Sequence, residues 1–169
     1  FESSFLKSGI YSKVFPKLLQ FKHLEITDSL QVSTAAHILN SFPHPQNVRS
    51  LAFKLYHKYD GDYKSCSQFK WALLRFDQLK HFKLNFVVGD PFLFIIEPLG
   101  QCSLLEKLDL TFNINTESKI IDQLAIFICK FPKLIDLKLI LILSEDSSVK
   151  SYETQIIFLI KQISSLQKL

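Results

Sequence analysis

Hydrophobic residues recur along the chain in one pattern, apolar-x-x-apolar-x-apolar, and the stretch LLEKLDLTFN at residues 104–113 is its clearest copy. The alternation at the end of each copy predicts a short β-strand. The pattern occurs six times, the last copy cut short, with the middle residues Leu24, Leu51, Phe82, Leu108, Leu137 and Leu169. These residues are 27, 31, 26, 29 and 32 positions apart, and a mean period of 29 indicates a repeat architecture.

A helical pattern precedes every strand pattern. It places apolar residues at i, i+4 and i+7, which is one face of an α-helix. The six triplets are Tyr11/Phe15/Leu18, Ala35/Leu39/Phe42, Phe69/Leu73/Phe76, Phe92/Ile96/Leu99, Leu124/Ile128/Phe131 and Ile156/Ile160/Ile163. The last triplet residue lies three positions before the first residue of the strand pattern in four copies, and six positions before it in two. One longer gap follows Phe42 and contains Pro43 and Pro45, and the other follows Leu99 and contains Gly100. Because proline and glycine favour turns, both gaps are predicted to be insertions in a surface turn.

One strand and one short helix are too small to bury their own apolar side chains. Stacking such units in parallel produces a shared core, so the pattern predicts an α/β solenoid. A doubly wound α/β sheet also alternates strands and helices. That fold usually has a glycine-rich cofactor turn, and the four glycines, Gly9, Gly61, Gly89 and Gly100, form no such cluster. The repeat is therefore the favoured interpretation.

The segment LGQCSLLEKLDLTFN, residues 99–113, resembles the leucine-rich repeat family, with Asn113 at the ninth position where that family usually has asparagine. The unit length and the helix in each unit resemble its ribonuclease-inhibitor-like subclass. The equivalent positions elsewhere are Ser29, Tyr56, Val87 and Ile142, so the family's asparagine ladder is expected to be mostly missing. The resemblance implies a horseshoe of about six repeats with a parallel concave sheet, convex helices and a role in binding macromolecules.

Chain length and composition fit this architecture. With 169 residues and 47% hydrophobic residues, the chain can bury one sizeable core. We expect residues 1–169 to be a single leucine-rich repeat segment of a longer protein, because methionine is absent and Leu169 falls inside the sixth strand pattern. We further expect the intact protein to continue beyond Leu169, or a partner to cover that end. Charged residues interrupt the most apolar region, residues 124–144, so no membrane span is predicted.

Charge and cysteine content narrow the choice of partner and compartment. The net charge is only +4, and lysine outnumbers arginine 18 to 2, which disfavours sequence-specific recognition of nucleic acid. Cys66, Cys102 and Cys129 are too widely spaced for a disulfide framework or a metal knuckle, so reduced, half-buried thiols are expected. The resemblance implies burial of Cys102 and Cys129, because they fall at helix-to-strand turns where the leucine-rich repeat family often buries a small thiol. These features and the absence of an N-glycosylation sequon favour an intracellular protein.

Strand alternation predicts which side chains face the open, concave side of the sheet. They are His23, Glu25, Thr27, Ser50, Ala52, Lys54, His81, Lys83, Asn85, Lys107, Asp109, Thr111, Asp136, Lys138, Ile140 and Lys168. Neighbouring strands should place Lys107 beside Asp136 and Asp109 beside Lys138, as pairs of opposite charge. Such a face favours a protein partner over a polyanion; the alternative is a face that is only solvated.

Two further features suit protein recognition. Alternation continues through residues 134–143, so Ile140 and Ile142 should point outward, where they would anchor a partner unless the following loop covers them. The connection LYHKYDGDYK holds Tyr59 and Tyr63 around a turn at residues 60–62, and the remaining ligands of a calcium loop are absent. The candidate partner-binding residues are His81, Lys83, Lys107, Asp109, Asp136, Lys138, Ile140, Ile142, Tyr59 and Tyr63.

Catalytic motifs are missing: there is no HExxH, no G-x-S-x-G and no P-loop. His23 and His81 should share a row of the sheet with Ser50 between them, which is too far apart for a metal pair. We therefore predict no catalytic residue, cofactor or metal, and a non-catalytic scaffold or adaptor that binds proteins through its concave face or its open ends. The alternatives are a substrate-receptor or GTPase-regulating subunit, or nucleic-acid binding through Lys54, Lys80, Lys83 and Lys107.

Overall fold

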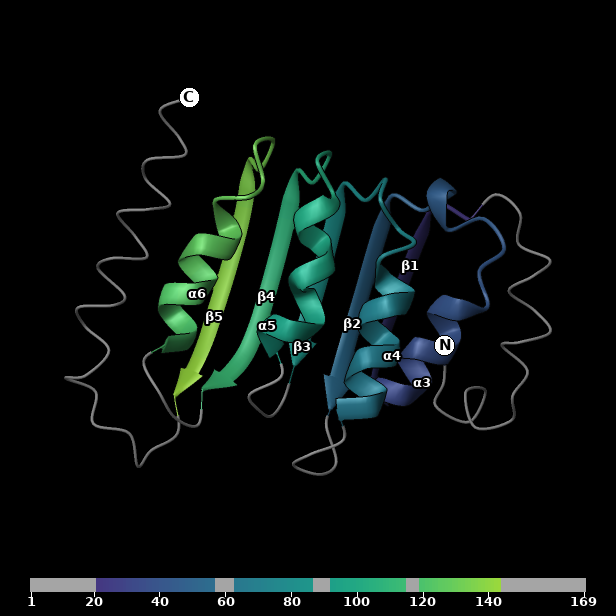
Figure 1. The fold of residues 1–169 in the computed structure, drawn as a ribbon, viewed down its shortest axis with the longest axis horizontal. Coiled ribbons are helices and arrows are strands. Elements are labelled where there is room, and N and C mark those ends of the chain that lie inside the picture. Colours follow the sequence, from purple (N-terminus) through teal and green to yellow (C-terminus); the bar gives the residue numbers. More distant parts are fainter. Residues whose placement is uncertain (1–20, 57–62, 87–91, 115–118, 144–169) are drawn as a thin grey trace.

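The computed structural model describes residues 21–56, 63–86, 92–114 and 119–143, in which strands and helices alternate (Figure 1). The strands are β1 (His23–Gln31), β2 (Ser50–Tyr56), β3 (His81–Phe86), β4 (Lys107–Ile114) and β5 (Asp136–Leu143). The helices are α3 (Val32–Asn40), α4 (Tyr63–Leu73), α5 (Phe92–Ile96) and α6 (Lys119–Ile128), with 3₁₀ helices η2 (Pro45–Asn47) and η3 (Glu97–Gln101). The first and last predicted helix triplets and the sixth strand pattern lie outside the described residues.

The strands form one parallel sheet in the order β1-β2-β3-β4-β5. The middle residues of the five described strand patterns pair in register across it, Leu24 with Leu51, then Phe82, Leu108 and Leu137. The predicted parallel α/β sheet is thus confirmed. Within the described ranges the helices cover one face of the sheet (Figure 1), whereas a doubly wound sheet carries helices on both. We name the two sides the covered face and the open face.

A hydrogen-bond arrangement recurs with the period of the sequence pattern. Just before each of strands β2 to β5, two successive backbone N–H groups donate to one carbonyl oxygen of the preceding unit, at 2.8–3.1 Å. The accepting residues are Lys22, Arg49, Lys80 and Glu106, and the donor pairs are Arg49/Ser50, Lys80/His81, Glu106/Lys107 and Ile135/Asp136. Each unit therefore begins in the same position relative to its neighbour.

The core lies between the sheet and the helices. The inward residues of β1 to β4 and one face of each helix are buried together. The predicted triplets identify this face, but the last members Phe42, Phe76 and Phe131 lie beyond the helices, which end at Asn40, Leu73 and Ile128. All three rings are nevertheless buried, and Phe42 and Phe76 contact edge to face at 5.7 Å between ring centroids.

Both longer gaps, which are predicted to be insertions in a surface turn, contain residues of a 3₁₀ helix. Pro45 begins η2, and η3 follows α5 directly and includes Pro98. Proline lacks the N–H that continues an α-helical ladder but fits the first turn of a helix. After η3, Cys102 takes the buried position six residues before the middle of its strand, as Phe76 and Phe131 do in their units.

β1 contains two extra residues. Its register with β2 passes from Ile26 opposite Phe53 directly to Ser29 opposite Lys54, so Thr27 and Asp28 have no partner in the register. The predicted equivalence of Ser29 and Tyr56 is therefore wrong, because Tyr56 pairs with Gln31. The equivalence of Asn113 and Ile142 is confirmed, and Val87 lies outside the described residues.

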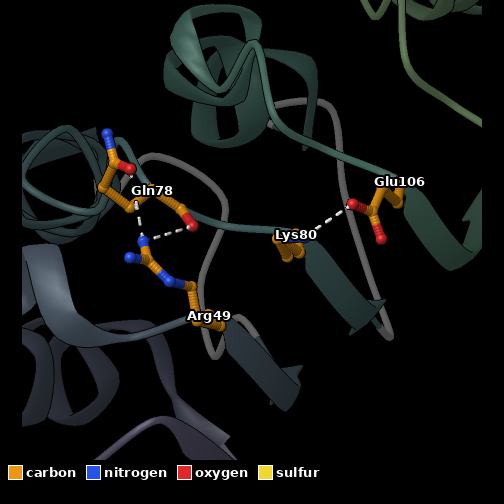
Figure 2. A network of polar contacts seen from close by, with 4 residues as sticks. All are labelled: Arg49, Gln78, Lys80 and Glu106. Atoms are coloured by element: carbon orange, nitrogen blue, oxygen red, sulfur yellow. Dashed lines mark hydrogen bonds and ion pairs between the residues drawn. The ribbon is translucent and has the colours of Figure 1, made fainter.

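Both arginines of the chain join one unit to the next. Arg49 Nη1 donates to the carbonyl oxygen and to Oε1 of Gln78, at 3.1 and 3.3 Å, and Lys80 Nζ bonds Glu106 Oε1 at 2.8 Å beside it (Figure 2). The Arg75 guanidinium donates to the carbonyl oxygens of Asn40 and Phe42, at 3.1 and 2.9 Å. These bonds satisfy backbone acceptors at and after a helix end, where intrahelical donors run out.

Candidate partner-binding surface

Two rows of side chains cross the open face, and each strand contributes one residue to each row. The strand register places His23, Ser50, His81, Lys107 and Asp136 in the first row, and Glu25, Ala52, Lys83, Asp109 and Lys138 in the second. Each of these side chains is exposed or half-buried, while the residues between them on the same strands face the core. The predicted assignment to the open face is therefore confirmed for both rows.

The rows line a hollow of about 420 Å³ that extends across all five strands. Ser50 and Ala52, both on β2, are its smallest lining side chains. A second hollow of about 160 Å³ lies further along the strands and is lined by Glu25, Thr27, Ala52, Lys54, Lys83 and Asn85, with the backbone positions of Ile26 and Phe53 beneath. The two hollows share Glu25, Ala52 and Lys83, and together they form one depression in the open face.

Ion pairs occupy the part of the depression formed by β4 and β5. Lys107 Nζ lies 3.6 Å from Asp136 Oδ2, and Lys138 Nζ lies 3.9 Å from Asp109 Oδ2. Both predicted pairs are confirmed. Because these side chains are largely solvated, each pair contributes roughly 0–1 kcal/mol to stability, and its main effect is to neutralise charge locally.

Apolar side chains extend the surface along β5. Ile140 is 39% exposed and Ile142 is 48% exposed, while Leu137, Leu139 and Leu141 of the same strand pack against the core. The predicted outward and inward positions are confirmed for these five residues. Two isoleucines on one side of the strand provide an apolar area next to a charged one, a combination typical of protein-binding surfaces.

The predicted tyrosine loop is only partly described. Tyr59 lies outside the described residues, and Tyr63 is the first residue of α4, so it belongs to a helix rather than to the loop. Its side chain is 67% exposed, on an element that covers the opposite face of the sheet from the depression. The structure therefore does not bring Tyr63 together with the other candidate residues.

Few of the described side chains are arranged for catalysis or metal binding. His23 and His81 share a row with the β2 residue Ser50 between them, as predicted, so their strands are separated by about 9–10 Å. Among the residues that the structure describes, no three His, Cys, Asp or Glu side chains gather to hold a metal ion. In the same ranges, no helix is both long and apolar enough to cross a membrane.

The cysteines differ in burial. Cys102 is buried as predicted, its thiol donates to the Phe76 carbonyl oxygen at 3.4 Å, and desolvation together with the nearby Asp77 carboxylate raises its pKa to about 11. A thiol in this state is a poor nucleophile. The predicted burial of Cys129 is wrong, because this residue points to solvent just after α6 and Phe131 fills the buried position instead.

Two ion pairs were missed by sequence reasoning. Lys80 bonds Glu106, and this hydrogen bond lowers the pKa of the Glu106 carboxyl. Lys80 and Glu106 each directly precede a strand, so the strand register that predicted the pairing of Lys107 with Asp136 also places these two residues side by side. Lys70 on α4 bonds Glu97 in η3 and lies 4.2 Å from the centre of the Phe94 ring; this contact between helices has no equivalent signal in the strand pattern.

Comparisons with known proteins add no assignment to this surface. A scan against protein-family models found no match, and a search of curated proteins found none either. The features of this surface that bear on function are therefore the depression, its charges and the exposed isoleucines of β5.

Proposed function

We propose that the chain is a non-catalytic, protein-binding segment built as a leucine-rich repeat solenoid, whose concave sheet face holds the partner. The sequential parallel strands, the helices on one face and the backbone bonds that repeat at the sequence period all support this architecture. A depression that crosses five strands is the form expected of a sheet curved toward its open face. Binding of a protein partner to this face would be equally compatible with a scaffold, an adaptor, a substrate-receptor subunit or a GTPase-regulating subunit.

One observation carries the proposal: the depression is lined by side chains of both charges, and the exposed Ile140 and Ile142 follow its lining residue Lys138 on the outward side of β5. Two outward isoleucines on one strand form an apolar area that a partner can bury. Nucleic-acid binding is disfavoured, because two of the four lysines considered for it are engaged by carboxylates, Lys80 by Glu106 and Lys107 by Asp136. Strong binding to nucleic acid draws on many phosphate contacts.

Filling the depression tests the proposal. Linear peptides are selected from a random display library on the folded chain, and their affinity is measured for Ala52→Tyr and for the control Gln68→Tyr. Ala52 lines both hollows, whereas Gln68 is exposed on α4. We expect Ala52→Tyr to weaken binding by about tenfold or more and the control to leave it unchanged. Peptides that bind both variants equally would show that the open face is not the binding site.

Ile140→Asp tests the apolar border. We expect the free energy of unfolding to change by no more than about 0.5 kcal/mol, because Ile140 is partly exposed and faces away from the core. Binding of the selected peptides should weaken, since the substitution places a charge where apolar contact is required. Equal losses of stability and affinity would mean that Ile140 belongs to the core.

A further inference from the structure

Lys54 and Lys83 are the lysines of the open face without an ion pair in the described part of the chain, although Asp109, the partner of Lys138, lies directly opposite Lys83 in the register. Lys107 and Lys138 pair with Asp136 and Asp109. No ion pair or hydrogen bond is found for the ammonium groups of Lys54 and Lys83 among the described residues, and both side chains are exposed. Positive charge is therefore concentrated over β2 and β3, while the β4–β5 area is balanced.

The strand register brings these two lysines together. Ala52 pairs with Lys83 and Lys54 pairs with Asn85, so Lys54 and Lys83 are diagonal neighbours on one face of the sheet. Strand spacing and the rise per residue place their Cα atoms about 8 Å apart, and both side chains are long enough to reach one ligand between them. Both line the hollow of about 160 Å³, together with the Asn85 amide and the Thr27 hydroxyl.

We infer that this hollow, lined by Lys54, Lys83, Asn85 and Thr27, binds an acidic side chain of the protein partner; the inference rests on the proposed function. A carboxylate has two acceptor oxygens, so it can bridge the two ammonium groups and offset part of their positive charge, and it can also accept a bond from the Asn85 amide. The hollow suits one side chain, since it is smaller than the pockets of roughly 300–1,000 Å³ that hold whole small molecules.

The surroundings restrict the partner further. Glu25 lines the same hollow from β1, and Asp109 and Asp136 line the neighbouring one. A run of acidic residues would meet these carboxylates, and charges of like sign placed opposite each other are unfavourable. The partner segment therefore carries an acidic residue over β2 and β3 and a basic or neutral residue over β1, which fits a mixed-charge protein segment better than a polyanion.

The test uses the display-selected peptides on the whole chain. We expect most of them to contain an acidic residue and to bind Lys54→Ser/Lys83→Ser about tenfold or more weakly than the wild type. The control Lys64→Ser/Lys130→Ser removes the same charge from exposed positions outside the open face and should bind normally. Replacing the acidic residue of the peptide by its amide should weaken binding to the wild type but add little in the Lys54/Lys83 variant, because the same contact is already lost.

The outcomes separate this inference from the proposed function. Peptides whose binding falls in Ala52→Tyr but not in Lys54→Ser/Lys83→Ser would overturn the acidic-side-chain site while the open face remains the binding surface. Peptides unaffected by either change would overturn both. A single-stranded oligonucleotide is the remaining probe: saturable binding that depends on Lys54 and Lys83 and exceeds that of the peptides would mean that the site takes phosphate, and would also overturn the inference.

Discussion

The two faces of the sheet differ in what their residues do, although they alternate along the same strands. On β3, Phe82 is 1% exposed and Leu84 is fully buried, while Lys83 between them is exposed on the open face. Inward residues pack against the neighbouring strands and the helices, so they hold one unit to the next. Outward residues make marginal ion pairs and line a depression. A step of one residue thus moves a side chain from the packed core to the open face.

The largest expected effect compares adjacent residues of β3. Phe82→Ala should lower the free energy of unfolding by about 3–5 kcal/mol, because it empties a fully buried ring position in the middle of the sheet. Lys83→Ala should change it by no more than about 0.5 kcal/mol. Urea unfolding followed by circular dichroism measures both. Similar losses of unfolding free energy in the two variants would show that the two faces contribute equally to stability.

A smaller effect tests the polar contacts beside the core. Arg75→Ala removes the donors to the carbonyl oxygens of Asn40 and Phe42, so we expect a loss of about 1–2 kcal/mol, reduced by the exposure of Arg75. Arg75→Lys keeps the positive charge but lacks the guanidinium that donates to both carbonyl oxygens at once, so it should retain only part of the stability that Arg75→Ala loses. Full restoration by lysine would mean that charge alone, rather than the bonds between units, is what matters.

The covered and open faces were predictable from sequence for the same physical reason. A period of two assigns each strand residue to a face, and the longer repeat period aligns the strands, so Lys107 opposite Asp136 and the outward Ile140 followed without coordinates. The extra residues Thr27 and Asp28 were not predicted. A two-residue insertion keeps Ile26 and Leu30 on the same face, and its one trace in the sequence is the polar Asp28, which stands two residues after Ile26 where the other strands have Leu55, Phe86, Phe112 and Leu141.

Other features depend on interactions that the repeat pattern does not contain. Cys129 and Phe131 are both apolar residues after α6, and only the packing decides that the ring is buried and the thiol exposed. The lack of an ion pair at Lys54 and Lys83 likewise became visible only when the partners of the other lysines were known. The positions of the candidate surface and its two ion pairs between β4 and β5 were therefore predictable, but the unpaired lysines of β2 and β3 were not.

The smallest expected effect lies at the border of the open face, where Lys80 bonds Glu106. That hydrogen bond lowers the pKa of Glu106 from its ordinary value of 4.5 in the folded protein, so folding favours the carboxylate. The resulting stabilisation is present above the unfolded pKa and is lost as the pH falls through the lowered folded pKa. Glu106→Gln should therefore be slightly less stable than the wild type at neutral pH, and the difference should vanish in acid.

Glu97 provides the matched control, because its pKa is lowered chiefly by a hydrogen bond from Lys70 between helices, away from the open face. Glu97→Gln should show the same pH dependence of stability, since the two carboxylates are bonded alike. Only Glu106 lies beside the first row of the depression, next to Lys107. Thermal unfolding scans should show the same pH dependence of stability for both variants. If the two faces are separate in function, only Glu106→Gln should also alter the affinity of peptides bound in the depression. An equal change of affinity in Glu97→Gln would show that polar contacts among the helices control the open face as well.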